Sequence, residues 1–213
     1  MQRVIVYIDG FNLYYGLKER GWKRYYWLDL RELSRAMCKQ YMELSVTKYF
    51  TSIISRTDPG KENRQKVYLE ALQTLPYFRI YYGHFLPKTI QCRSCGDCWQ
   101  TYEEKMTDVC IGTELLTDAF QDRFDIAIVV SGDSDLSPPI EAVRKHFPDK
   151  RIIVGFPPSR TSMKLRKTAN GFFNIGEKKL KRSMLPDKVI KADGHTLHRP
   201  EEWRKNIKPE RKK

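Results

Sequence analysis

The sequence lacks any uninterrupted apolar run long enough to span a membrane, and its first ten residues, MQRVIVYIDG, lack the layout of a secretory signal peptide. It also lacks an internal repeat. These absences predict a cytoplasmic protein that has no membrane partner.

Acidic residues are the scarcer charge: 26 Asp and Glu stand against 39 Lys and Arg, a formal net charge of +13. The excess is uneven, because residues 177–213 alone carry a net charge of +7. Excess cation attracts polyanions by releasing their counterions. The charge therefore favours a nucleic-acid partner over the two alternatives, solubility alone or an acidic protein partner.

Cysteines number only five, an odd count, and three of them form a C-x2-C-x2-C pattern in CRSCGDCW: Cys92, Cys95 and Cys98. In a reducing compartment this spacing favours a metal site over disulfides. Two thiolates at C-x2-C make half of a tetrahedral zinc site, and the third cysteine could be another ligand. Structural zinc and a metal-free loop both stay open. The fourth zinc ligand could be His84, Cys110 or Cys38, or it could come from another chain, which leaves a homo-oligomer open as well.

The remaining composition is that of a folded chain, since 40% of the 213 residues are hydrophobic and 31% are charged. β-branched and aromatic runs predict strands, and apolar residues at helical spacing predict helices between them. This alternation indicates βαβ units and an α/β fold with a mostly parallel sheet. The expected strands are 4–8, 46–54, 78–86, 125–130 and 151–156, and the expected helices are 12–20, 29–41, 64–75, 105–120, 137–147 and 162–170.

One domain, residues 1–186, is expected to carry two additions. The first is a short Cys-rich insertion at about residues 88–101. The second is residues 187–213, which are polar, basic and punctuated by Gly and Pro, and which we expect to form a loose basic tail.

Carboxylates follow two of the expected strands, although the chain as a whole is basic. Asp9 comes directly after the first strand, and Asp133 and Asp135 follow the fourth in VVSGDSDL. Parallel α/β sheets bind ligands beyond the carboxyl ends of their strands. Each acid alone has a simpler explanation, such as an Asp-Gly turn, a helix capped by Asn12, or an ordinary loop acid.

Asp108 changes that balance. On the expected helix it shares a face with apolar positions that should pack on the sheet, and an inward carboxylate is costly unless it is paired or bound to a cation. An ion pair with Lys105 would explain Asp108 but not the other acids. Several carboxylates in one pocket repel each other, and Mg²⁺ or Mn²⁺ relieves the repulsion with hard oxygen ligands. Such a pocket suits metal-assisted attack on a phosphodiester.

The sequence resembles the NYN domain family, the LabA/DUF88-like members of the PIN-like nuclease superfamily. The matching motifs are YIDGFNLYYGL, EEKMTDVCIGTELL, VVSGDSDLSPPI, SMKLRKTANGFFNI and KRSMLP, in the family's order over about residues 3–186. The resemblance implies a Rossmann-like, PIN-like three-layer fold with an acidic Mg²⁺ or Mn²⁺ pocket.

By that resemblance, the metal-site acids are Asp9, Asp108 and Asp133, Asp135 is the second acid of the GDSD motif, and Asn12 is the polar residue of the DGFN motif. Substrate contacts are expected from Lys105, Ser131, Lys178, Lys179, Lys181 and Arg182. Three aromatic residues could stack on unpaired bases or serve only in packing: Trp99, Tyr102 and Trp203.

The leading hypothesis is a metal-dependent ribonuclease that acts on RNA. The alternative is a non-catalytic nucleic-acid-binding or regulatory module that keeps the acidic pocket as a relic, and the presence of all four acids favours the enzyme. A small-molecule phosphohydrolase is disfavoured because the first strand ends in DGFN and not in a DxD sequence.

Overall fold

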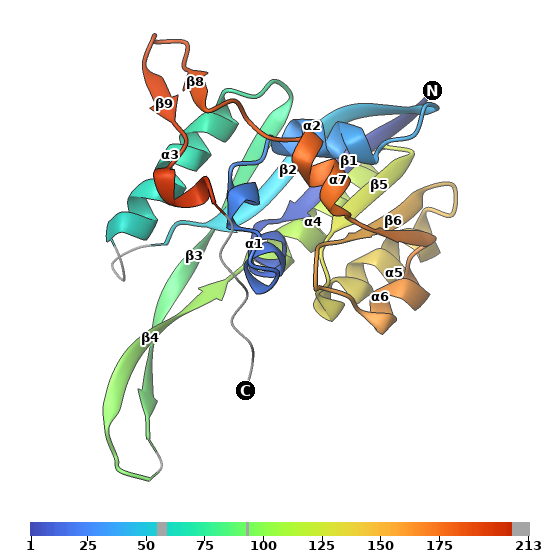
Figure 1. The fold of residues 1–213 in the computed structure, drawn as a ribbon. Coiled ribbons are helices and arrows are strands. Elements are labelled where there is room, and N and C mark those ends of the chain that lie inside the picture. The colour runs from blue at the N-terminus through green and yellow to red at the C-terminus, as the bar shows by residue number, and fades with distance from the viewer. Residues whose placement is uncertain (55–58, 93, 206–213) are drawn as a thin grey trace.

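A computed structural model describes residues 1–54, 59–92 and 94–205 of the chain. Figure 1 shows a central sheet with helices on both sides and a long hairpin that projects from one edge. The strands and helices, in chain order, are β1 (Gln2–Asp9), α1 (Gly10–Glu19), η1 (Lys23–Tyr26), α2 (Leu30–Met37), β2 (Met42–Ser52), α3 (Pro59–Gln73), β3 (Phe78–Gln91), β4 (Cys98–Lys105), α4 (Thr107–Phe120), β5 (Ile126–Val130), η2 (Ser134–Leu136), α5 (Ser137–His146), β6 (Arg151–Phe156), α6 (Met163–Thr168), β7 (Gly171–Asn174), α7 (Glu177–Arg182), β8 (Lys188–Ile190), β9 (Thr196–His198) and η3 (Glu201–Trp203).

The main sheet has the strand order β4-β3-β2-β1-β5-β6-β7. The six strands from β3 to β7 in this order are parallel, and β4 alone runs antiparallel, against β3. The predicted α/β fold is therefore confirmed. Because the chain moves outward from β1 through β2 to β3 and then returns to β5, the strand order reverses between β1 and β5. In open α/β sheets, ligands bind at such a reversal.

Helices cover both faces of the sheet, which explains why β1 is apolar along its whole length. Val6 and Ile8 pack in one core, together with side chains from α1, α2, α3 and α7. Ile5 and Tyr7 point the other way and pack with side chains from α4, α5 and α6. The period of two along a strand thus sends alternate residues into two separate cores. The result is the expected three-layer arrangement.

The Cys-rich insertion forms the end of a long hairpin made by β3 and β4 (Figure 1). β3 continues five residues beyond the expected end of its strand, to Gln91, and β4 pairs with it from Cys98 to Lys105. The cysteines therefore lie at the tip of the hairpin, away from the body of the sheet.

The prediction that residues 187–213 form a loose tail is wrong for the part up to residue 205, because that part folds onto the domain. β8 and β9 form a small antiparallel sheet, and Val189, Leu197 and Trp203 are buried. The indole of Trp203 packs against the rings of Tyr26 and Trp27. A few apolar anchors thus outweigh the basic composition from which the tail was predicted. In the described part of the chain, no helix is both long and apolar enough to cross a membrane.

A buried ion-pair network joins α4 to the sheet. Lys48 of β2 is only 1% exposed, and its Nζ lies 2.6 Å from Oε2 of Glu114 and 2.5 Å from Oδ2 of Asp118. The hydroxyl of Tyr7, on β1, donates to the same Asp118 oxygen at 2.5 Å. Burial alone would lower the pKa of Lys48, but the two carboxylates raise it above its ordinary value. The ammonium therefore stays charged and holds α4 in register on the sheet.

We expect Lys48→Met to destabilise the fold by about 3 kcal/mol, because it leaves the Asp118 carboxylate in the interior without its closest cation. Breaking a buried ion pair usually costs about 3–5 kcal/mol of folding stability. The guanidinium of Arg123 lies 3.1 Å from Asp118 and still compensates its charge in part, so we expect a value at the lower end of that range. Denaturant unfolding measures the change. The double variant Lys48→Met, Asp118→Leu should recover much of the loss, and a double variant as unstable as the single one would contradict this account.

Candidate active site

Asp9 ends β1 and caps α1. Its Oδ1 accepts a hydrogen bond from the backbone N–H of Asn12 at 3.0 Å, and its Oδ2 accepts one from the Asn12 side-chain amide at 2.7 Å. Asp is a preferred N-cap because its side chain satisfies a helix N–H that has no partner within the helix. The carboxylate is only 2% exposed. The YIDGFN sequence thus produces a strand end and a helix start that share one buried acid.

Ser131 ties this acid to the end of β5. Its hydroxyl donates to Oδ2 of Asp9 at 2.8 Å and accepts from the backbone N–H of Asp133 at 3.0 Å. The N–H of Gly132 donates to Oδ1 of Asn12 at 3.1 Å. Ser131 is fully buried, and contact of its hydroxyl with substrate stays a prediction. Its hydroxyl is used to position Asp9 and Asp133.

Gly132 is required by a close approach of the chain. A Cβ at this position would lie 2.9 Å from the Cβ of Arg160 and 3.1 Å from the carbonyl carbon of the same residue. Such contacts do not occur without a shift of the backbone. The glycine of the GDSD sequence therefore lets the loop after β5 approach Arg160 and Thr161 closely.

Asp133 and Asp135 occupy the loop after β5. Oδ1 of Asp133 accepts a hydrogen bond from the backbone N–H of Asp135 at 3.0 Å, so Asp133 caps η2. Asp133 is half-buried, whereas Asp135 is exposed. Burial raises the pKa of the Asp9 carboxyl above its ordinary value. The hydrogen bonds from Asn12 and Ser131 offset this only in part, and the charge of Asp133 adds to it. A cation beside the two acids would relieve both effects.

The position of Asp108 follows from the packing of α4. It lies in the first turn of α4, one turn before Gly112, whose backbone packs so closely on the start of α5 that a Cβ would be 3.3 Å from Cγ of Pro139. α4 covers the sheet face that carries Tyr7, so Asp108 lies on that face and at the carboxyl edge. It is half-buried.

The acids do not form a complete set of protein ligands. Within the described residues, no three His, Cys, Asp or Glu side chains gather closely enough to hold a metal ion. The structure brings Asp9 and Asp133 together through Ser131, and Asp135 follows in the same loop, while a place for Asp108 in this site stays a prediction. Mg²⁺ is usually held by one or two carboxylates, with waters and substrate phosphates completing its shell. A pair of carboxylates, one of them desolvated, fits that mode of binding.

Residues 3–176 match the family model of the NYN domain. The chain belongs to the NYN domain family. The predicted resemblance is therefore confirmed over most of the chain, and with it the assignment to a PIN-like nuclease family.

Two known proteins are similar to this NYN chain. The crystal structure of VPA0982, a protein of unknown function from Vibrio parahaemolyticus, has a TM-score of 0.53 and 24% sequence identity, over 86% of this chain and 96% of that one. This likeness concerns the fold. The curated protein 6-hydroxy-3-succinoylpyridine 3-monooxygenase HspA, from Pseudomonas putida (strain DSM 28022 / S16), is 29% identical over 191 residues. The match covers 74% of this chain but 60% of HspA, so the NYN chain spans about three fifths of that relative.

Cys92, Cys95 and Cys98 of the hairpin tip are free thiols. Backbone N–H groups of Cys95 and Ser94 donate to the sulfur of Cys92 and lower the pKa of its thiol. His84 cannot be the missing ligand, because it lies eight residues back along β3, about 26 Å away at about 3.3 Å per residue. Cys38, which follows α2, and Cys110 of α4 belong to the body of the domain and not to the hairpin. Zinc therefore stays a prediction.

The predicted basic contacts lie in two places. α7 packs against α2, and Nζ of Lys179 donates to the carbonyl oxygen of Ala36 at 2.7 Å. α2 leads into Met42, which pairs with Gln2 at the amino end of β1, the end opposite to Asp9. The ammonium of Lys179 is thereby held on the end of α2, while Glu177, at the start of α7, bonds to Arg24 and Tyr25 of η1. Their role in gathering RNA stays a prediction for Lys178, Lys179, Lys181 and Arg182, while Lys105 is exposed at the end of β4, close to Asp108 in the chain.

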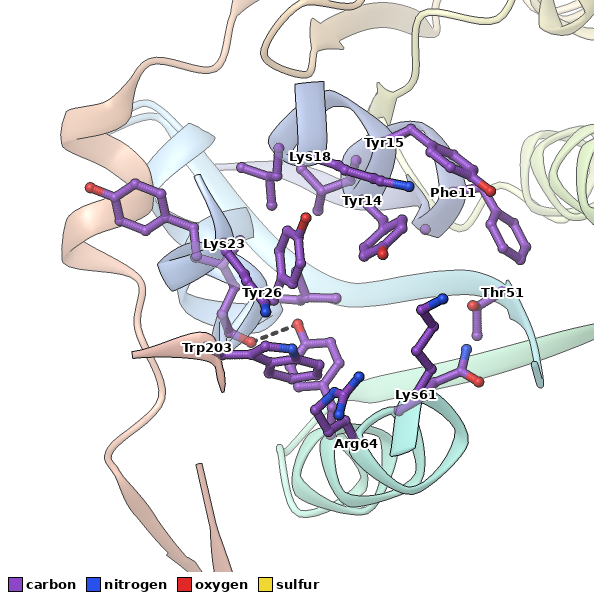
Figure 2. A pocket seen from close by; sticks show the side chains of 18 of the residues that line it. Phe11, Tyr14, Tyr15, Lys18, Lys23, Tyr26, Thr51, Lys61, Arg64 and Trp203 are labelled. Atoms are coloured by element: carbon purple, nitrogen blue, oxygen red, sulfur yellow. Dashed lines mark hydrogen bonds between the residues drawn. The ribbon is translucent and has the colours of Figure 1, made fainter. Parts of the chain in front are cut away.

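Sequence reasoning missed a groove of about 890 Å³ beside the acids, between α1, α3 and η3 (Figure 2). A signal for it was present: Phe11, Tyr14, Tyr15 and Lys18 follow the offsets of one helix face. Of the aromatics expected to stack on bases, Trp203 lines this groove, although it is only 8% exposed. The side chains of Trp99 and Tyr102 lie outside the described part of the structure.

We expect Cys92 to be alkylated by iodoacetamide at lower pH than Cys38. The reactive species is the thiolate, whose pKa is lowered at Cys92 by backbone donors and raised at Cys38 by burial. Peptide mapping by mass spectrometry, after treatment with a chelator, gives the pH midpoint for each thiol. A midpoint for Cys92 at or above that of Cys38 would contradict the turn geometry.

Proposed function

We propose that this NYN-domain protein is a divalent-metal-dependent ribonuclease whose site is the carboxyl edge of β1 and β5. The observation that carries the proposal is the buried Asp9, held by Asn12 and Ser131 and placed beside Asp133 where the strand order reverses. The membership of the chain in a PIN-like nuclease family supports a nucleic-acid substrate.

Asp9 and Asp133 would hold Mg²⁺ or Mn²⁺, with Asp108 and Asp135 at the border, and the ion would supply Lewis-acid stabilisation of phosphate charge and a more acidic water. The chain itself provides the preorganisation. Three hydrogen bonds fix the Asp9 carboxylate, so it needs no rearrangement when a substrate arrives. Without a cation the acids would repel a phosphate, and this repulsion makes cleavage dependent on added metal.

A second candidate function is the conversion of a small aromatic acid. The 29% identity to HspA and the aromatic, cation-bearing groove favour it. The non-catalytic alternative, a regulatory module that binds nucleic acid, predicts binding of RNA without any metal-dependent cleavage. With single-stranded RNA, the ribonuclease predicts metal-dependent cleavage and the regulatory module predicts binding without cleavage. The enzyme acting on a small aromatic acid predicts neither.

We expect Asp133→Asn to reduce Mg²⁺- or Mn²⁺-dependent cleavage of single-stranded RNA by at least about 100-fold, because several kcal/mol of charge stabilisation is lost. Asp9→Asn should have the same effect and keep the fold, since Asn also caps helices. A fluorescent oligonucleotide measures cleavage, and circular dichroism checks folding.

Asp149→Asn is the matched control. It makes the same chemical change at an exposed acid just before β6, at the amino edge of the sheet, and it should cleave like the wild type. Equal cleavage by the wild type and Asp133→Asn would indicate a contaminating nuclease. RNA binding without metal-dependent cleavage in any preparation would support the non-catalytic alternative.

A further inference from the structure

The groove lies next to the acid pair of Asp9 and Asp133. Gly10, which follows Asp9 directly, lines it at one side, and Thr51, near the carboxyl end of β2, lines its floor. A Cβ on Gly10 would lie 2.7 Å from the carbonyl oxygen of Phe50, so α1 starts in close contact with β2. The acids and the groove are therefore separated by no more than the first turn of α1.

Two helices line the groove with matching stripes of side chains. Figure 2 shows α1 on one side and α3 on the other, with η1 and Trp203 at one end. Both stripes follow the offsets of three, four and seven residues that mark one face of a helix. The stripe on α1 is Phe11, Tyr14, Tyr15 and Lys18, and the stripe on α3 is Lys61, Arg64, Gln65 and Tyr68.

Aromatic rings form a continuous row along the α1 side. The ring of Phe11 stacks on that of Tyr15, with centroids 6.4 Å apart, and also meets Phe85 of β3 edge-on at 5.9 Å. Tyr14 lies 5.3 Å from Tyr15 and 4.9 Å from Tyr26. Tyr15 is nonetheless 44% exposed. The row thus runs from the base of the hairpin to η1 and leaves open ring surface on which a planar group could stack.

The charge of the groove is positive. Its lining includes four cationic side chains, of which Arg64 is paired with Glu202 at 2.8 Å, and a single acid, Glu19, which is paired with Arg160. Nζ of Lys18 lies 5.7 Å from the centre of the Tyr15 ring, so a cation and an exposed ring stand together. The cationic side chains are Lys18, Lys23, Lys61 and Arg64. Rings with interleaved cations suit a ligand that alternates planar bases with phosphates.

We propose that this groove binds unpaired nucleotides of an RNA strand beside the phosphate at Asp9, with bases stacked on Tyr15 and its neighbours and phosphates paired with Lys18 and Lys61. The position of that phosphate rests on the proposed ribonuclease function, but binding in the groove does not. A duplex keeps its bases stacked on one another and cannot offer them to the rings. The groove therefore makes the protein selective for single strands.

The test measures binding of a fluorescent single-stranded oligouridylate to the full chain in the presence of a chelator, so that metal-dependent cleavage cannot interfere. Tyr15→Ala should weaken binding by about 5- to 150-fold, the range for one stacked base. Tyr15→Phe keeps the ring and should stay within about twofold of the wild type. Lys18→Ala should flatten the plot of log affinity against log salt by about 0.7.

Tyr41→Ala is the matched control, because Tyr41 is 48% exposed and has the ammonium of Lys39 5.9 Å from its ring, yet lies next to Met42 at the amino edge of the sheet. It should bind like the wild type. Wild-type affinity in Tyr15→Ala would overturn the proposal, as would equal affinity of the wild type for a duplex and a single strand.

Two further results separate this proposal from the ribonuclease function. Loss of binding in Tyr15→Ala, in a protein that never cleaves RNA, would support the groove and reject the enzyme. Cleavage that depends on Asp133 but not on Tyr15, with unchanged binding, would support the enzyme and overturn the groove. Saturable binding of pyridine-3-carboxylate that requires Tyr15, without RNA binding, would assign the groove to small aromatic acids and overturn the proposal.

Discussion

The buried carboxylate of Asp9 is the constraint on which the rest of the site depends. One side chain closes β1, caps α1 and, through the hydroxyl of Ser131, fixes the loop that follows β5. A desolvated acid is costly, and its pKa is raised by burial, so the fold keeps it only by surrounding it with donors. Those same donors hold Asp133 close by. The cost of burying one charge is thus what organises the carboxyl edge of the sheet.

The direction of α1 follows from that cap and gives the helix two functional faces. Its inner residues, Leu13 and Leu17, pack in the core. Its outer stripe, from Phe11 to Lys18, lines the groove. On the other face of the sheet, the ion pairs of Lys48 hold α4 in register, and Asp108 lies in the first turn of that helix. Acid site and groove are therefore positioned by the same layers that form the core.

Local patterns predicted five of the strands and the mostly parallel sheet well, because a buried parallel strand needs an unbroken apolar run and a crossover helix needs an apolar stripe. The acids at strand ends were found for the same reason. The segment after residue 186 was mispredicted, since average charge and Gly/Pro content hid three apolar anchors: Val189, Leu197 and Trp203. The hydrogen bond from Ser131 to Asp9 was not predicted, because a motif position does not reveal whether its hydroxyl faces solvent or Asp9.

By itself, the sequence determined the α/β class and the NYN assignment, since each depends on residues that are close together in the chain. Only the tertiary structure decided which distant groups meet. The pairing of β1 with β5 brings Ser131 to Asp9 across 122 positions of the chain. The facing of α1 and α3 turns two ordinary amphipathic stripes into one groove. Neither is encoded in a local pattern, because both arise from how the layers pack on a shared sheet.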